Sequence, residues 1–363
     1  MRKLSVFLGV VLWTIGSAVS AQEVDSMAPM QKSSWGDASE SEITDYIPDI
    51  SLDTRFGYSH DFAEGTGRFG GNGLFLDING IISPQLSYSL NHRLANFEGL
   101  DEPGFGNTNW LTLTYENDWF FVTAGKEDIK VGSFEYDAYD LDCYWEMNSQ
   151  FWNNVNPWHW GISAGWYPAE DHTLLIQACN SPFATTEIGN LFAYALAWKG
   201  EWDWYESYWS ANLWQYDKKG FVKSLNLGNR FHVEDFSFDL EYSTRFIDKK
   251  AFTGDFTLLF SPSYEWDWGR AFAKIGWERV SDCTYICPFD DLEDGLFSGD
   301  NFFYGAGAEF FPFRSCEDIR IHAIWASNSH LTAGHYINIG LTWKFDLTAA
   351  GKALFNRLNN RQK

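Results

Sequence analysis

The feature that most constrains this chain is an alternation of apolar and polar residues that recurs from residue 51 onward. Between Phe236 and Phe246, Phe, Leu, Tyr and Thr occupy every second position, and Ser, Asp, Glu and Arg fill the positions between them. Successive side chains of a β-strand point to opposite faces. The pattern therefore predicts a strand with one apolar and one polar face.

Sixteen segments of this kind follow one another, each about ten residues long, which is the length that a tilted strand needs to cross a bilayer. A sheet in lipid must close on itself, because an open edge would leave backbone N–H and C=O groups without partners. We therefore predict an all-β fold, a closed antiparallel transmembrane β-barrel of 16 strands. The segments begin near Ser51, Gly73, Leu86, Trp110, Trp119, His159, His172, Leu191, Tyr205, Val222, Phe236, Phe256, Arg270, Asn301, Ile319 and Tyr336.

The connections between these segments are of two kinds. Those after even-numbered segments are short, and those after odd-numbered segments are mostly longer. Short periplasmic turns and long extracellular loops are typical of outer-membrane barrels. The repeat Glu-x-Asp-Trp accompanies three short turns, at 116–119, 201–204 and 265–268. A Trp beside a turn suits the headgroup level of a membrane better than the core of a soluble sixteen-strand sandwich, which is the alternative fold.

Composition and charge exclude other classes. Aromatic residues make up 18% of the chain, which is too many for a disordered protein. A formal net charge of −23 would repel a phosphate backbone, so no nucleic-acid partner is expected. After residue 15, no apolar run approaches the length of a spanning helix.

The first residues resemble a secretory signal, with Arg2 and Lys3 before an apolar stretch and small residues up to Ala21. The predicted organisation is a signal peptide over 1–21, a periplasmic lead-in over 22–50, the barrel over 51–345 and a periplasmic tail, expected to be helical, over 346–363. The expected location is the outer membrane of a Gram-negative bacterium, after cleavage of the signal. The five cysteines, whose pairing the sequence leaves open, are Cys143, Cys179, Cys283, Cys287 and Cys316.

A barrel of sixteen strands is wide enough for an aqueous channel. Polar residues on the inward side of each strand would line it, with charges of both signs. The predicted lumen wall contains Asp53, Arg55, Asp77, Arg93, Lys199, Arg230, Asp239, Glu241, Arg245, Lys274, Glu278, Glu309, Arg320 and Lys344.

The connection after the fifth segment is the longest, and no Lys or Arg occurs between Lys130 and Lys199. If this loop folds inward, its acids and aromatic rings form a constriction that favours cations. If it stays outside, it only covers the outer rim. The predicted constriction residues are Glu135, Tyr136, Asp137, Tyr139, Asp140, Asp142 and Glu146.

Other motifs carry less weight. The acidic loop from Asp282 to Asp300 lacks the ligand pattern of an EF-hand and is interpreted as a solvated tip, so no metal is expected. No phosphate-binding, nucleophile-elbow or zinc-protease motif is present, and His330 and His335 lack partners for catalysis. No enzyme activity and no cofactor are expected. The pairs Lys218-Lys219 and Lys249-Lys250 would lie at the outer rim, where they face either solutes or lipid phosphates.

Three stretches resemble the phosphate-selective porin O and P family, in particular its shorter members in Bacteroidota. They are residues 73–94, 110–128 and 337–345. The resemblance implies a sixteen-stranded outer-membrane porin that forms a homotrimer and folds its third loop inward. The basic constriction that gives the family its phosphate selectivity is absent here, since the corresponding loop carries acids.

The sequence thus predicts an outer-membrane porin for passive diffusion of small polar solutes or ions, without phosphate preference, in contact with outer-membrane lipid. The alternative is a plugged barrel that acts as a surface structural or interaction protein.

Overall fold

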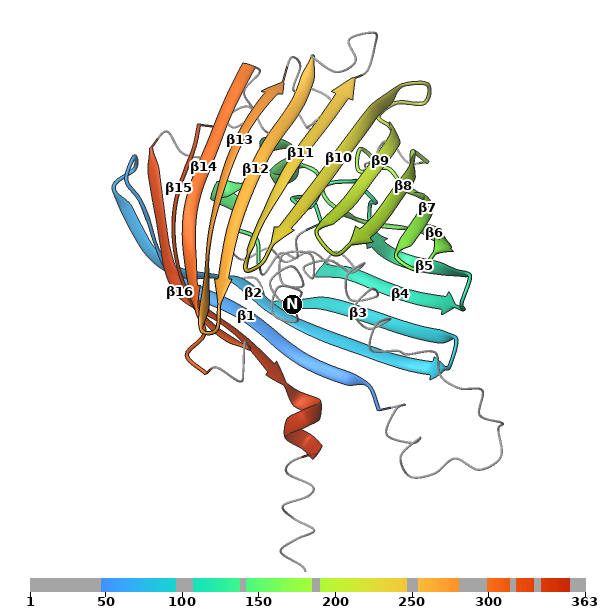
Figure 1. Ribbon diagram of the computed structural model, residues 1–363, viewed down its shortest axis with the longest axis horizontal. Coiled ribbons are helices and arrows are strands. Elements are labelled where there is room, and N and C mark those ends of the chain that lie inside the picture. The colour runs from blue at the N-terminus through green and yellow to red at the C-terminus, as the bar shows by residue number, and fades with distance from the viewer. Residues whose placement is uncertain are drawn as a thin grey trace, which may run out of the picture.

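The computed structural model describes residues 47–95, 107–137, 142–184, 190–246, 254–280, 299–313, 318–329 and 334–352. Over these ranges, sixteen strands form one closed antiparallel barrel, in which each strand pairs with the next and β1 pairs with β16 (Figure 1). This confirms the predicted fold class. The strands are β1 (Asp49–Asp61), β2 (Thr66–Ser83), β3 (Leu86–Ala95), β4 (Thr108–Glu116), β5 (Phe120–Asp128), β6 (Trp158–Ala169), β7 (His172–Asn180), β8 (Phe192–Trp202), β9 (Tyr205–Gln215), β10 (Phe221–Val233), β11 (Phe236–Phe246), β12 (Asp255–Trp266), β13 (Gly269–Val280), β14 (Gly299–Phe310), β15 (Ile319–Asn328) and β16 (His335–Asp346).

The predicted start of β2 is wrong by seven residues. The strand begins at Thr66 and pairs with β1 from its first residue, opposite Asp61. Four glycines between residues 67 and 73 carry no side chains that could show an alternation. The connection between β1 and β2 is consequently only four residues long, although it follows an odd-numbered strand. The other fifteen starts lie within two residues of the predicted ones.

The barrel is apolar outside and polar inside. On β6, Ile162 and Trp166 point outward and are 51% and 52% exposed. On β11, Asp239, Glu241 and Arg245 alternate with outward apolar residues and are at most 6% exposed. A soluble protein buries its apolar residues and exposes its charges. The reverse arrangement is that of a barrel surrounded by lipid.

The short turns lie together at one end of the barrel, which we call the short-turn end (connections 84–85, 117–119, 170–171, 203–204, 234–235 and 267–268). At the same end, β16 runs into a helical segment over 347–352 (Figure 1). The tryptophans of the repeated turn motif, Trp119, Trp204 and Trp268, are between 46% and 70% exposed at this end. No described helix is long and apolar enough to cross a membrane.

Candidate functional site

The connection between β5 and β6, residues 129–157, leaves the barrel wall and returns to it at the same place. The backbone N–H of Ile129 donates to the carbonyl of Pro157 over 2.8 Å. Between these residues the chain forms a 3-10 helix, η2 (Trp145–Met147), and a short α-helix, α4 (Gln150–Asn154). We call this segment the inner loop, because its backbone and side chains contact inward-facing residues of strands across the barrel.

The inner loop first runs along β9. The Gly132 N–H donates to the Ser210 hydroxyl over 2.8 Å, and the Asn212 side chain donates to the Lys130 carbonyl over 2.8 Å. A Cβ on Gly132 would lie only 2.4 Å from the backbone nitrogen of Ser210, so only glycine permits this close approach. The sequence Lys-Val-Gly after β5 therefore sets how tightly the loop lies on the wall.

Aromatic packing holds the loop to the same side. The ring of Phe151 on α4 stacks on Trp214 of β9, with centroids 5.6 Å apart and an interplanar angle of 4°. Tyr136 and Phe183 belong to the same buried cluster. The barrel therefore contains a small hydrophobic core between the loop and β7 to β10, which fixes the loop without any disulfide.

Hydrogen bonds anchor the loop to the opposite wall as well. The fully buried Glu278 carboxylate on β13 accepts the backbone N–H groups of Gln150 and Phe151 at the start of α4, over 2.7 and 3.2 Å. Arg245 of β11 donates to the same carboxylate over 3.0 Å. These N–H groups have no partner within the helix. Glu278 thus caps α4 from a strand, and Arg245 compensates its charge.

Three of the described acids of the loop face bases on the wall. Glu135 lies 3.3 Å from Lys274, Asp137 3.6 Å from Lys199, and Asp142 2.5 Å from Arg320. Arg55 also donates to the carbonyl of Cys143 over 2.8 Å. The loop therefore brings carboxylates to a wall that carries cations. Of the remaining predicted constriction residues, Tyr136 lies in the hydrophobic core, Glu146 lies on η2, and Tyr139 and Asp140 lie outside the described residues.

The predicted wall residues all lie on strands of the barrel, and ten of the fourteen are buried. Three of the wall's arginines are held by wall carboxylates: Arg230 by Asp239, Arg245 by Glu278, and Arg270 by Glu309. Arg93 lies over the ring of Phe75, 5.2 Å from its centroid, and Lys344 is opposite Asp53 in the register of β16 and β1. The buried residues of the predicted wall are Asp53, Arg55, Asp77, Arg230, Asp239, Glu241, Arg245, Glu278, Glu309 and Arg320, and Arg270, which was not predicted, is buried as well.

Burial changes the protonation of the loop. It raises the pKa of Asp137 to about 7, although the nearby Lys199 ammonium acts in the opposite direction. Burial and the carboxylate of Glu309, to which its hydroxyl donates over 2.9 Å, raise the pKa of Tyr144. Asp137 therefore changes its charge near neutral pH, whereas Tyr144 stays neutral.

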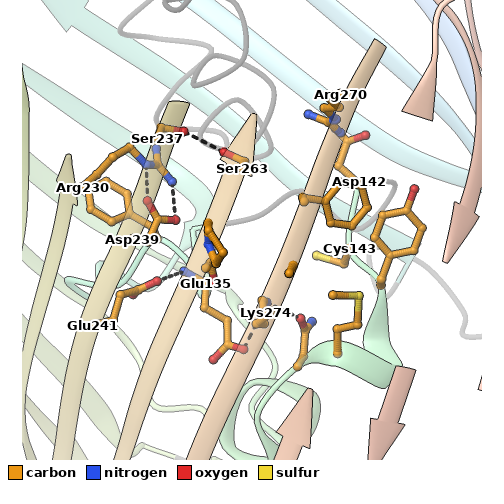
Figure 2. A pocket seen from close by; sticks show the side chains of 18 residues that line it. Glu135, Asp142, Cys143, Arg230, Ser237, Asp239, Glu241, Ser263, Arg270 and Lys274 are labelled. Atoms are coloured by element: carbon orange, nitrogen blue, oxygen red, sulfur yellow. Dashed lines mark hydrogen bonds and ion pairs between the residues drawn. The ribbon is translucent and has the colours of Figure 1, made fainter. Parts of the chain in front are cut away.

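A cavity lies between the inner loop and the inward faces of β10 to β13 (Figure 2). Its lining residues on these strands belong to the strand halves nearer the short-turn end. The loop contributes Phe134, Glu135 and residues from Asp142 to Asn148, while the strands contribute Arg230, Asp239, Glu241, Arg270 and Lys274 among others. Its lining mixes charged and polar side chains with apolar ones.

Several residues of the site were not predicted. Ser210, Asn212, Gln177, Asn148 and Asn328 form the hydrogen bonds that seat the loop. The only signal in the sequence was the presence of Ser, Asn and Gln at inward positions, where a merely hydrated wall would look the same. The buried cluster of Glu127, Asp128 and Lys130, with Lys130 2.7 Å from Asp128, was also missed.

The cysteines, histidines and lysine pairs singled out in the sequence form no site in the described part of the chain. Cys143 and Cys179 are buried and form no disulfide with a described residue, and the other three cysteines lie outside the described residues. His335 begins β16, its ring centroid 5.4 Å from that of Trp325. His330, Lys249 and Lys250, and the acidic loop up to residue 298, are likewise outside, while Lys218 and Lys219 are exposed in the turn after β9. In the described part of the chain, no three His, Cys, Asp or Glu side chains gather as metal ligands would.

Comparison with solved structures places the fold among porins. A porin refined at 1.8 Å resolution superposes with a TM-score of 0.53 at 13% identity, over 82% of this chain and 100% of that one. A loop L8 deletion mutant of OmpT, an outer membrane protein of Vibrio cholerae, gives 0.56 at 11% identity over 83% and 100%. A mutant of the Rh. blastica porin gives 0.54 at 12% identity over the same shares. The chain thus has a porin-like barrel.

No family model matches the chain, and no curated protein matches it. The likeness to solved porins is therefore one of fold.

Proposed function

We propose that the protein is an outer-membrane porin that lets small polar solutes or ions diffuse through its lumen. The observation that carries this proposal is the reversed polarity of the closed barrel, with an apolar outer belt around a wall of buried charges. An interior of paired charges is stable only where water or polar groups surround it. The porin-like fold supports the proposal, and passive diffusion requires no catalytic residue or cofactor.

In this proposal the inner loop is the constriction. It crosses the lumen from β9 to β13, β14 and β15, so a solute must pass beside it. Its carboxylates Glu135, Asp137 and Asp142 are ion-paired, which weakens the cation selectivity that a ring of free acids would give. We therefore propose a modest cation preference.

Phosphate preference is not part of the proposal. The loop carries no base between Gly132 and Pro157, and carboxylates already hold the guanidinium groups of Arg230, Arg245 and Arg270. The resemblance to the phosphate-selective porin O and P family remains a prediction. We do not extend that family's phosphate selectivity to this protein.

Reversal potentials in planar bilayers test the function. Purified, refolded protein is inserted between solutions of unequal KCl concentration, and the sign of the zero-current potential gives the preferred ion. We expect stepwise conductance and a small potential of the sign that marks potassium preference. Strong preference for chloride or phosphate would contradict the selectivity proposed here.

A specific observation also favours the plugged barrel as a second candidate. The inner loop is bonded to both sides of the lumen and encloses a hydrophobic core, so it fills much of the cross-section. A plugged barrel would fold, as shown by a heat-dependent shift in gel mobility, and would insert without conductance.

The location and assembly belong to the same proposal. We propose export by cleavage after Ala21, insertion in the outer membrane with the short-turn end in the periplasm, and a homotrimer. Mass measurement of the detergent-extracted native protein distinguishes a trimer from a monomer. N-terminal sequencing of the same material locates the cleavage.

A further inference from the structure

The cavity beside the inner loop is lined by two chemically different kinds of side chain. Its apolar lining comes from Phe134, Met147, Pro262 and Phe272. Its charged lining comes from β10, β11 and β13 together with Glu135 and Asp142 of the loop (Figure 2). A recess with apolar walls and a few convergent polar groups is the usual form of a small-molecule site.

Almost every charge at the cavity has a partner of opposite sign. Two carboxylate–guanidinium pairs account for both of its arginines: Arg230 with Asp239 at 2.5 and 2.8 Å, and Arg270 with Glu309 at 2.8 Å. Lys274 is held by Glu135 and by the Asn148 side chain. Asp142 is bound to Arg320.

Glu241 is the exception. Its side chain is only 4% exposed, and one oxygen accepts the backbone N–H of Glu135 over 3.1 Å. Figure 2 shows the carboxylate extending from β11 toward that residue. The other oxygen has no hydrogen-bond partner, and no base of the described chain lies within ion-pair distance of it. Glu241 also borders the smaller recess behind the loop, so it stands where the two spaces meet.

A buried carboxylate without a counter-ion is costly, and the cost falls when a cation binds beside it. A guanidinium of the protein cannot supply that cation here, since Arg230 is already bound to Asp239 and lies 4.0 Å from the ring of Phe134. A hard metal ion would need several more oxygen ligands. An ammonium group needs only a few acceptors, and the apolar lining residues would contact a short alkyl chain attached to it.

We propose that this cavity is a binding subsite for small organic cations, solutes that carry a primary ammonium group on a short apolar chain, with Glu241 as the partner of the ammonium. The inference rests on the proposed function in one respect: the solute reaches the cavity by entering the lumen. Its affinity comes from the pairing of Glu241 and from contact of the alkyl chain with Phe272 and Met147.

Titration calorimetry on the folded, full-length protein in detergent tests the proposal. The probes are butylammonium, butanol and butyrate, which share an alkyl chain and differ in charge. We expect saturable binding of butylammonium and weaker binding of methylammonium, with none detected for butanol or butyrate. Equal binding of butanol or butyrate would overturn the proposal, and this outcome needs no variant.

The Glu241→Gln variant removes the charge and keeps the shape, so butylammonium affinity should fall at least tenfold. Glu116→Gln is the matched control: the same change on β4, where the carboxylate accepts from Tyr167 away from the cavity, should leave affinity unchanged. Unchanged affinity in Glu241→Gln would overturn the proposal. If the protein conducts ions but binds no amine, only the subsite proposal is overturned. If it binds the amine but does not conduct, the subsite proposal is supported and the proposed porin function is contradicted.

Discussion

The carboxylate of Glu278 accepts the backbone N–H of Gln150 over 2.7 Å, across the lumen and 128 positions apart in the chain. The contact joins the strand wall to the first turn of α4. Since Arg245 and Thr257 donate to the same carboxylate, three strands and the inner loop meet at one buried charge. The position of the loop therefore depends on the wall's ion pairs.

Replacing Glu278 with Gln should release the loop at α4. The substitution leaves Arg245 buried without its counter-ion, which costs about 3–5 kcal/mol when one partner of a buried pair is removed. We expect a lower free energy of unfolding in urea and faster proteolysis within residues 129–157. The exposed Asp171→Asn turn variant should match the wild type in both measurements, and equal stability of the two variants would contradict the anchoring role.

The Gly132→Ala variant tests the close approach of the loop to β9. The added methyl group meets the backbone of Trp209 and Ser210, which cannot move aside. Overpacking of this kind costs about 1–3 kcal/mol, and we expect the loop to shift and the channel current to become noisier. Gly70→Ala on β2 is the control, because open space surrounds that position. Identical single-channel records for the two variants would argue against the contact.

The pH dependence of stability should contain a contribution from Asp137. Its pKa of about 7 lies above the ordinary value of 3.8, so the folded protein binds more protons than the unfolded chain between these values. The contribution is therefore fully present below about pH 4 and is lost as the pH rises through 7. Urea midpoints of the wild type, relative to Asp137→Asn, should fall over this interval and level off above it. If the difference between the two urea midpoints does not change with pH, Asp137 is ionised over the whole interval.

A charge placed on the outer face of the barrel tests whether this face contacts lipid or water. Ile162 lies near the middle of β6 and is half exposed. Its replacement by Lys should cost about 2–4 kcal/mol if the residue faces the bilayer midplane, whereas the same charge on a water-facing surface costs little. Folding yield into lipid vesicles measures the effect, with Glu170→Lys in a short turn as the control. If both variants fold equally well, the outer belt does not lie in lipid.

The sequence predicted the strands well because the evidence for them is local. On β11, the polarity of each side chain is enough to predict whether it faces lipid or lumen. Closure of the barrel follows from the cost of an open sheet edge in lipid. The start of β2 was predicted wrongly because glycines 67, 70, 71 and 73 have no side chains that could show which face of the strand they occupy.

The inner loop was only partly predictable. Its acids were visible in the sequence, but their partners were not, because Lys199, Lys274 and Arg320 lie between 62 and 178 positions away. An ion pair of this kind depends on barrel closure and register, which no short motif encodes. The unpaired state of Glu241 depends on the whole set of pairs around it, and so it emerged only from the assembled barrel.

The most direct measurement compares the conductance of the intact protein with that of a variant whose inner loop is replaced. Ile129 and Pro157 are hydrogen-bonded neighbours, so a short Gly-Ser linker in place of residues 132–154 closes the gap without strain. If the barrel is a channel that this loop narrows, both proteins conduct and the variant conducts several-fold more current. Equal currents would contradict the proposal that the inner loop narrows the channel. The absence of current from both folded proteins would contradict the proposal that the protein is a porin.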